Sequence, residues 1–184
     1  MKIIGIAGSL RAASFNAALL RAATGLMPPD ASLEIATIRG IPLYDGDIEK
    51  NQGIPDAVTA LKEQIATADG LLLASPEYNN SMPGVFKNAI DWLSRPPADI
   101  PRIFGDRPVA LIGASPGGFG TVLAQNAWLP VLRTLGMQPW FGGRLMVSRA
   151  GKVFNEAGEL MDQQVRGQLE QFLQGFTGFV SGRE

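Results

Sequence analysis

Five apolar runs of strand length alternate along the chain with segments whose apolar residues recur at helical spacing. The runs cover residues 2–7, 33–38, 70–74, 108–114 and 138–141, and the last can extend through residue 146. The helical segments cover residues 15–26, 58–68, 85–93, 122–135 and 161–176. Strands that alternate with helices predict an α/β fold, in which a parallel sheet carries helices on both faces.

The spacing of these elements also predicts how the sheet is ordered. The 184 residues contain no repeat, low-complexity tract or long linker, so we expect a single domain over residues 1–184. A doubly wound, five-stranded chain of this length favours the strand order 2-1-3-4-5. In that order the carboxyl ends of the first, third and fourth strands meet at the switch point, where open α/β sheets bind their ligands.

Smaller signals refine the expected elements. Gly136 is placed to end the fourth helix, and Pro130 is expected to kink it. The proline-rich stretch 95–101 is the best loop candidate. The acidic run 45–49 lacks the spacing of a calcium-binding loop and is expected to be a solvated turn.

Composition removes several classes of chemistry. The chain has no His and no Cys, which excludes the catalytic triads that need either residue, zinc-thiolate sites and disulfides. Any enzymatic activity is therefore expected to rely on a cofactor. The net charge of −1 gives no reason to expect nucleic acid or a membrane as partner. The first strand begins at Lys2, so we expect no signal peptide and a cytoplasmic location.

The loop after the first strand, residues 8–16, has the donors that a phosphate needs. Ser9, Ser14 and Asn16 can donate hydrogen bonds, Arg11 adds positive charge, and the loop contains no carboxylate. A helix that begins near Ser14 would also direct its unpaired N–H groups at an anion. The simpler alternative is that Ser14 is only a helix N-cap and Arg11 a solvated residue. Neither dinucleotide nor P-loop glycine motifs occur, so a single terminal phosphate is the better fit.

A second loop, residues 75–84, follows the third strand. It combines turn-forming residues with Tyr78, and its main-chain groups suit the edge of a flat polar ring. Glu77 can bind such a ring through its carboxylate or only through its backbone amide, and we expect the backbone role. A phosphate joined to a flat heterocycle is a flavin mononucleotide (FMN). The third loop, residues 115–121, ends at the same edge of the predicted sheet.

The segments GSLRAASFN, SPEYNNSMPGVFKNAIDWLS and ASPGGFGT resemble those of the NADPH-dependent FMN reductase family, in the branch with bacterial chromate and quinone reductases. The resemblance runs from residue 2 to about residue 180. It implies a flavodoxin-like fold and non-covalently bound FMN. It also implies that NADPH or NADH serves as co-substrate for reducing quinones, free flavin, azo compounds or chromate in a ping-pong reaction.

The resemblance also assigns residues to the flavin. The phosphate would be surrounded by Ser9, Arg11, Ser14, Phe15 and Asn16. The ring would be lined by Pro76, Glu77, Tyr78 and Asn79, with Ser115 and Gly118 nearby. Chromate-reducing relatives often carry Tyr and Arg in the helix after the third loop, where this chain reads Gln125-Asn126-Ala127-Trp128-Leu129. The subunit contacts and the preferred acceptor therefore stay open.

Other interpretations remain at this point. An electron-carrier flavoprotein without NAD(P)H activity would share the fold, although flavodoxins are strongly acidic and this chain is nearly neutral. A flavin-free binding module is a further alternative.

Self-association is expected from the apolar helices. The segments 85–93 and 122–135 carry Trp92 and Trp128 on more faces than one sheet covers, which favours a partner. The family implies a homodimer or homotetramer, with residues 78–82 near the other subunit. The alternative is that both tryptophans fill the core of one chain.

Overall fold

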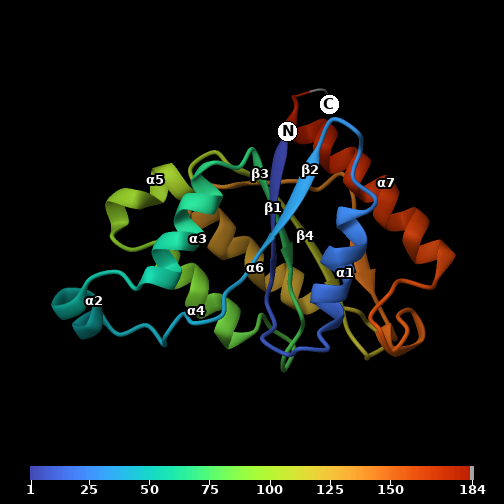
Figure 1. Cartoon of the computed structure of the whole chain (residues 1–184), viewed down its shortest axis with the longest axis horizontal. Helices are drawn as coiled ribbons and strands as arrows, with labels where there is room; N and C mark the ends of the chain where they lie inside the picture. Colours follow the sequence, from blue (N-terminus) through green and yellow to red (C-terminus); the bar gives the residue numbers. More distant parts are fainter. Residues whose placement is uncertain (183–184) are drawn as a thin grey trace.

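The computed structural model describes residues 1–182, and its centre is a parallel β-sheet (Figure 1). The hydrogen-bonded order is β2-β1-β3-β4-β5, and β6 also pairs with β4. The strands are β1 Lys2–Ala7, β2 Ser32–Ala36, β3 Gly70–Ala74, β4 Pro108–Ala114, β5 Gln138–Pro139 and β6 Leu145–Val147. Both the predicted fold class and the predicted strand order are confirmed, and the sheet has a sixth strand.

The sixth strand arises because the last predicted strand is interrupted. Pairing with β4 runs through Pro139 and resumes at Leu145. Between them the chain bends around the indole of Trp140, whose ring packs edge-on against Phe172 at 4.9 Å. A Cβ built on Gly142 would lie 2.6 Å from the Trp140 Nε1, so only glycine fits this bend. The tryptophan that anchors the C-terminal helix thus splits the edge strand in two.

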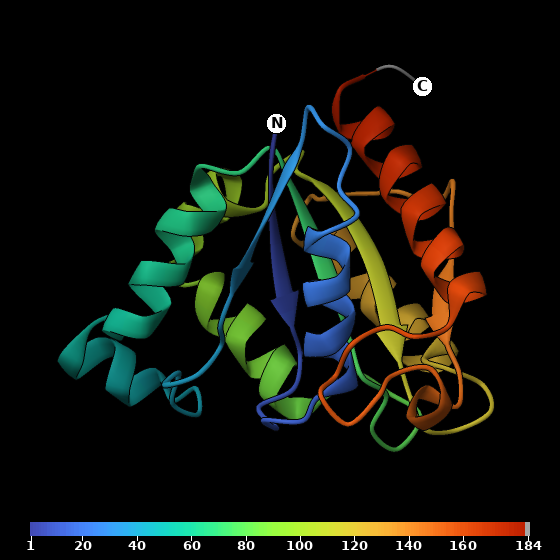
Figure 2. The same cartoon turned by 45° about the vertical axis from the view of Figure 1, so that its right-hand side comes forward.

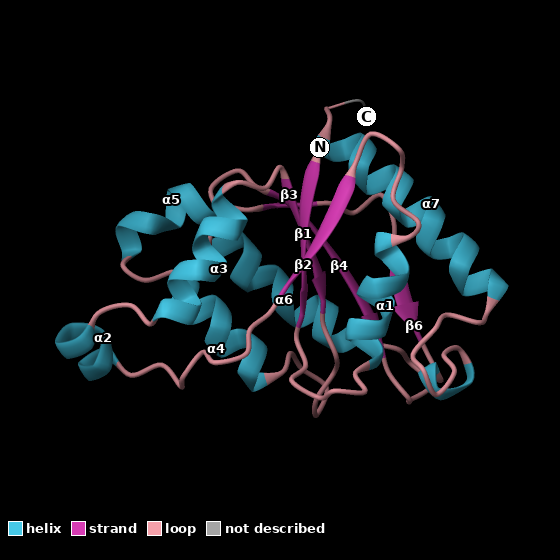
Figure 3. Cartoon of the chain, viewed as in Figure 1, coloured by secondary structure: helices cyan, strands magenta, loops and turns pink. Residues whose placement is uncertain are grey.

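Two layers of helices enclose the sheet (Figures 2 and 3). One face is covered by α1 Phe15–Thr24 and α7 Gln163–Val180. The other is covered by α3 Asp56–Ala66, α4 Gly84–Leu93 and α6 Val122–Thr134. Each face buries its own apolar cluster. Gly136 has φ +72° and lies just beyond α6, as predicted, while α6 continues through Pro130.

Two expected loops contain helices. The acidic run is not only a turn, because α2 Gly46–Gln52 forms there. The Asp45 carboxylate caps it by accepting from the Asp47 N–H at 2.8 Å. Glu49 accepts from Arg95 Nε at 2.9 Å, and this bond holds the pKa of Glu49 below its ordinary value. The proline-rich stretch contains the 3-10 turn Pro97–Asp99 and the short helix α5 Ile100–Ile103.

The two tryptophans do not face a partner, which corrects the expectation drawn from the helix pattern. Trp92 and Trp128 are both fully buried within the single chain. The Trp92 indole donates to the Pro42 carbonyl at 2.9 Å, and Trp128 packs edge-on against Phe86 with centroids 4.9 Å apart. Helical periodicity could not reveal that the second helix layer buries these rings. The large apolar side chains left exposed include Leu10, Tyr78, Val85, Phe119, Val122, Leu123 and Phe141.

Candidate functional site

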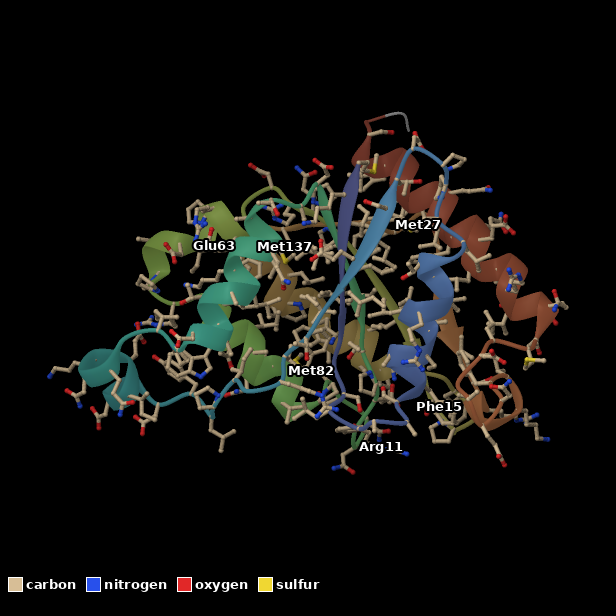
Figure 4. The ribbon with its side chains drawn as sticks, viewed as in Figure 1. Arg11, Phe15, Met27, Glu63, Met82 and Met137 are labelled. Atoms are coloured by element: carbon tan, nitrogen blue, oxygen red, sulfur yellow. The ribbon has the colours of Figure 1, made fainter. Side chains whose placement is uncertain are left out.

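The three loops predicted to meet do meet, at the carboxyl edge of the sheet. A hollow of about 60 Å³ lies among them. Figure 4 shows Arg11 and Phe15 at this edge, with Met27 and Met137 in the opposite half of the molecule. The lining residues are Ser9, Arg11, Ser14, Phe15, Asn16, Pro76, Glu77, Tyr78, Ala114, Ser115 and Pro116. Nine predicted site residues are therefore brought together, while Asn79 and Gly118 are not among the lining residues.

The hollow is much smaller than the roughly 300–1,000 Å³ of a site that encloses a small ligand. A phosphate-sized group can enter it, and anything larger must extend over the surface. Two lining residues, Ala114 and Pro116, were missed from the sequence. Their signal was present, since Ala114 ends a predicted strand and Pro116 follows a predicted site residue.

The first loop ends at the N-terminus of α1, where Ser14 is the N-cap. Its hydroxyl accepts from the Ala17 N–H at 3.2 Å, so its own hydrogen can still be donated. Among the described residues, no acceptor is hydrogen-bonded to the N–H groups of Phe15 and Asn16. These two amides, the Ser14 hydroxyl and the helix dipole give the hollow an anion-binding wall. Ser14 is thus both a cap and a donor.

Asn16 has a different role from the one expected of its side chain. The side chain is buried, its Nδ2 donates to the Ala114 carbonyl at 2.9 Å, and its Oδ1 accepts from the Ala114 N–H at 2.9 Å. An amide engaged in this way joins the first loop to the end of β4. Asn16 can therefore bind an anion through its main-chain N–H, while its side chain fixes the distance between the first and third loops.

The second loop is shaped by a tight turn beyond the hollow. Tyr78 and Ser81 exchange two backbone hydrogen bonds of 3.0 and 3.1 Å. Asn79 and Asn80 between them have φ of 50° and 61°, a left-handed pair that asparagine tolerates well. The turn carries Asn79 away from the hollow and leaves Tyr78 at its rim. The Tyr78 hydroxyl lies 3.4 Å from the Ser9 Oγ, so the first two loops touch across the hollow.

The Glu77 carboxylate is turned away from the hollow. Its Oε2 accepts from the Leu123 N–H at 2.8 Å and the Ala124 N–H at 3.0 Å, and so caps the N-terminus of α6. The backbone N–H of Glu77 has no acceptor among the described residues. This arrangement agrees with the backbone role expected for Glu77. It also keeps the carboxylate of Glu77, the one acidic side chain among the lining residues, bonded to α6 and turned away from the hollow.

The third loop is held by the end of β6 and by the segment that follows it. The Ser115 N–H donates to the Val147 carbonyl at 2.9 Å, and the Arg149 N–H donates to the Gly117 carbonyl at 2.9 Å. Arg149 has φ 50°, an uncommon conformation for arginine. The Ser115 Oγ accepts from the Gly117 N–H at 3.1 Å. The loop therefore presents Ser115 to the hollow and leaves Gly118 exposed beyond it.

Close packing beneath the hollow needs glycine at two positions. A Cβ built on Gly8 would lie 2.2 Å from the Phe86 ring. One on Gly113 would lie 2.0 Å from the Thr121 hydroxyl. Because neither glycine has a Cβ, the Phe86 ring and the Thr121 side chain can pack directly against the main chain beneath the loops.

The chemistry of the hollow fits a flavin mononucleotide. Unpaired N–H groups of Phe15 and Asn16, two serine hydroxyls and the Arg11 side chain suit a phosphate. The unpaired Glu77 N–H lies beside Pro76 and Tyr78, where it can donate a hydrogen bond to the edge of a ring. Among the described residues, no cluster of His, Cys, Asp and Glu could hold a metal ion. No helix in residues 1–182 is long and apolar enough to cross a membrane.

The fold is that of a flavodoxin-like α/β protein, and the hollow lies at its switch point. The family model for NADPH-dependent FMN reductase matches residues 1–152. The chain belongs to this family. The predicted class of enzyme, an oxidoreductase that uses FMN and NAD(P)H, is confirmed by this membership.

Individual relatives agree with the family. An NAD(P)H-dependent FMN reductase of Pseudomonas aeruginosa is 47% identical over 180 residues, which is 98% of this chain and 95% of that protein. A 2-hydroxy-1,4-benzoquinone reductase of Burkholderia is 37% identical over 100% of this chain and 98% of that protein. Among solved structures, the flavoenzyme NAD(P)H:(acceptor) oxidoreductase FerB of Paracoccus denitrificans superposes with a TM-score of 0.87. It is 28% identical and covers 99% of this chain and 98% of its own.

Proposed function

We propose that the protein reduces quinones with electrons from NADPH or NADH through FMN bound at the three-loop hollow. The observation that carries this proposal is the donor set of the hollow. Hydroxyls, main-chain N–H groups and Arg11 face it, and its one carboxylate is engaged by α6. The quinone reductases among the relatives support the choice of acceptor.

Each loop has a distinct part in holding the cofactor. Ser9, Arg11 and Ser14, with the main chain of Phe15 and Asn16, bind the phosphate. Pro76, Glu77 and Tyr78 line one side of the ring, with the Glu77 N–H as the main-chain donor, and Ser115 lies near the ring. Asn79 and Gly118, which lie outside the hollow, would border the part of the ring that extends over the surface. Bound FMN would supply the redox chemistry, so the reaction needs no side chain of the hollow as an acid or base. Protons for the acceptor come from solvent, because the site is open.

The small volume of the hollow bears on the order in which the electron donor and the acceptor bind. A ring that lies over the surface keeps one face accessible, and donor and acceptor then use this face in turn. This supports a ping-pong reaction, in which the oxidised nicotinamide leaves before the quinone binds. Free FMN, azo dyes and chromate are further acceptors that such an open face admits.

Steady-state kinetics tests the proposal. NADPH oxidation by the purified protein is followed with benzoquinone as acceptor, at several concentrations of each, and NADH, free FMN, an azo dye and chromate are compared in parallel. We expect turnover with quinone and parallel lines in double-reciprocal plots. An electron carrier would consume no NADPH with quinone alone, and intersecting lines would contradict the ping-pong order.

We also propose that the protein assembles as a homodimer or homotetramer. A groove of about 390 Å³ runs between α6 and the interrupted edge strand. Its walls include Val122 and Leu123, both about two-fifths exposed, and Phe141, which is 70% exposed. Apolar surface of this kind beside the second loop favours burial against another copy, with residues 78–82 near the partner.

Light scattering at micromolar concentration measures the assembly. We expect a mass of two or four times 19.6 kDa. Phe141→Glu should lower the mass without unfolding the chain, because the ring packs little in the single chain. A mass near 19.6 kDa for the native protein would refute self-association.

A further inference from the structure

Helix α6 holds the peptide between Pro76 and Glu77 by two separate routes. The first is a relay of hydrogen bonds that starts at Trp128. The Trp128 Nε1–H donates to the Ser75 Oγ at 2.8 Å, and the Ser75 hydroxyl donates to the Pro76 carbonyl at 3.0 Å. Trp128 and Ser75 are both fully buried, so water does not compete for these bonds. The relay fixes the direction of the Pro76 carbonyl.

The direction of this carbonyl decides where the next N–H points. In a planar trans peptide the C=O and the following N–H point in opposite directions. The Pro76 carbonyl is hydrogen-bonded to the buried Ser75, so the Glu77 N–H is directed away from the core. That N–H has no acceptor among the described residues, and Glu77 lines the hollow. The relay therefore aims a free donor at the site.

The second route starts at the N-terminus of the same helix. The Glu77 carboxylate accepts from the N–H groups of Leu123 and Ala124. Trp128 lies five residues beyond Leu123 on α6. The peptide is thus held on its carbonyl side by the middle of α6 and on its Glu77 side by the start of α6. Rotation of the peptide would break the Ser75 bond to the Pro76 carbonyl, and the carboxylate bonds restrain the residue that carries the N–H.

We propose that Trp128 and Ser75 are positioning residues that aim the Glu77 N–H at an acceptor on the edge of the flavin ring. The inference rests on the proposed function, since it needs a flavin in the hollow. Neither residue lines the hollow, so they act only through the Pro76–Glu77 peptide. Flavin affinity and the electronic state of the ring then depend on a tryptophan of the second helix layer.

The chain offers a matched control for this proposal. Trp92 is also fully buried, and its indole donates to a single carbonyl, that of Pro42, at 2.9 Å. Neither Trp92 nor Pro42 lines the hollow. Trp92→Phe and Trp128→Phe each remove one buried indole hydrogen bond and keep an aromatic ring. A merely structural role predicts the same behaviour for both variants.

The experiment compares the affinities of the full-length variants for FMN and for riboflavin, which lacks the phosphate. We expect Trp128→Phe to weaken both ligands by the same factor, roughly three- to tenfold, because one ring contact is misaligned. The visible absorption band of bound FMN should also shift. Trp92→Phe should leave affinity and spectrum unchanged while lowering thermal stability by a similar amount.

A double-mutant cycle tests the route. Ser75→Ala should weaken both flavins as Trp128→Phe does, and adding Trp128→Phe to Ser75→Ala should cause no further loss. Additive losses of flavin affinity in the double variant would contradict the relay. Equal losses of flavin affinity in Trp92→Phe and Trp128→Phe would also contradict it. Unchanged flavin affinity in Trp128→Phe would also overturn it. Failure of the native protein to bind either flavin would instead refute the proposed function.

Discussion

The side-chain amide of Asn16 and the peptide groups of Ala114 form two reciprocal hydrogen bonds of 2.9 Å each. Asn16 lies in the first turn of α1 and Ala114 is the last residue of β4, 98 positions later. Both residues line the hollow. This buried clamp therefore sets the separation of the first and third loops and keeps the N–H groups of α1 aimed at one point.

Breaking the clamp should affect both stability and flavin binding. Asn16→Ala leaves a buried donor and a buried acceptor of Ala114 unpaired, which costs about 2–4 kcal/mol of unfolding free energy. Asn88→Ala is the control, because the Asn88 side chain also bonds two main-chain groups, the Tyr44 N–H and the Pro42 carbonyl, both at 2.8 Å. Urea unfolding should show losses in both variants, whereas an FMN titration should show weaker binding only for Asn16→Ala. Equal FMN affinity in the two variants would contradict a role for the clamp in the site.

Arg11 should act on the phosphate alone. Arg11→Ala removes a charge-assisted bond, and we expect FMN to bind about ten- to a hundredfold more weakly. Riboflavin, which lacks the phosphate, should bind as it does to the native protein. Arg166→Ala removes the same charge from an exposed position on α7 and should change neither affinity. Equal losses of affinity for FMN and riboflavin in Arg11→Ala would show that Arg11 does not bind the phosphate.

Much of this site could be predicted because it lies at strand ends. The apolar runs fixed β1, β3 and β4, and loops that follow parallel strands must meet at one edge. The side-chain roles of Asn16 and Glu77 could not be predicted. Asn16 bonds a residue 98 positions away, and Glu77 caps a helix that begins 45 residues later. Periodicity contains no information on which polar group will find which distant main-chain partner.

The buried tryptophans illustrate a second limit of the sequence. The apolar pattern of α6 correctly marked Trp128 as a residue that avoids water. Whether a second subunit or the same chain covers the ring depends on the packing of α4 against α6, where Phe86 meets Trp128 at 4.9 Å. Apolar periodicity could not predict helix α2 for a related reason. That helix has no buried residue, and the Asp45 cap and the Glu49–Arg95 pair hold it instead.

A partly buried ion pair away from the site should make the free energy of unfolding depend on pH. The Lys62 side chain is 3% exposed and its Nζ bonds the Asp99 Oδ2 at 2.8 Å. This hydrogen bond lowers the pKa of Asp99. A carboxyl whose pKa is lower in the folded state stabilises the fold at neutral pH, and this contribution is lost as the pH falls through the lowered value.

Asp99→Asn should therefore be less stable than the native protein by about 1–3 kcal/mol at pH 7, because the buried Lys62 side chain loses its carboxylate partner. The difference should narrow from about pH 4 downward, where an ordinary aspartate begins to protonate. Urea unfolding of both proteins between pH 7 and pH 3 measures it. A difference that stays constant over this range would show that the pair contributes no pH-dependent stability.

The central claim is that the three-loop hollow binds a flavin with a single terminal phosphate. Its most direct test is to denature the purified, yellow protein and identify the released flavin by chromatography against FMN, FAD and riboflavin standards. We expect FMN, at about one per chain, because the unpaired N–H groups of Phe15 and Asn16 and the Arg11 side chain provide for one phosphate. Release of FAD, or a colourless protein that takes up no FMN on titration, would contradict the account.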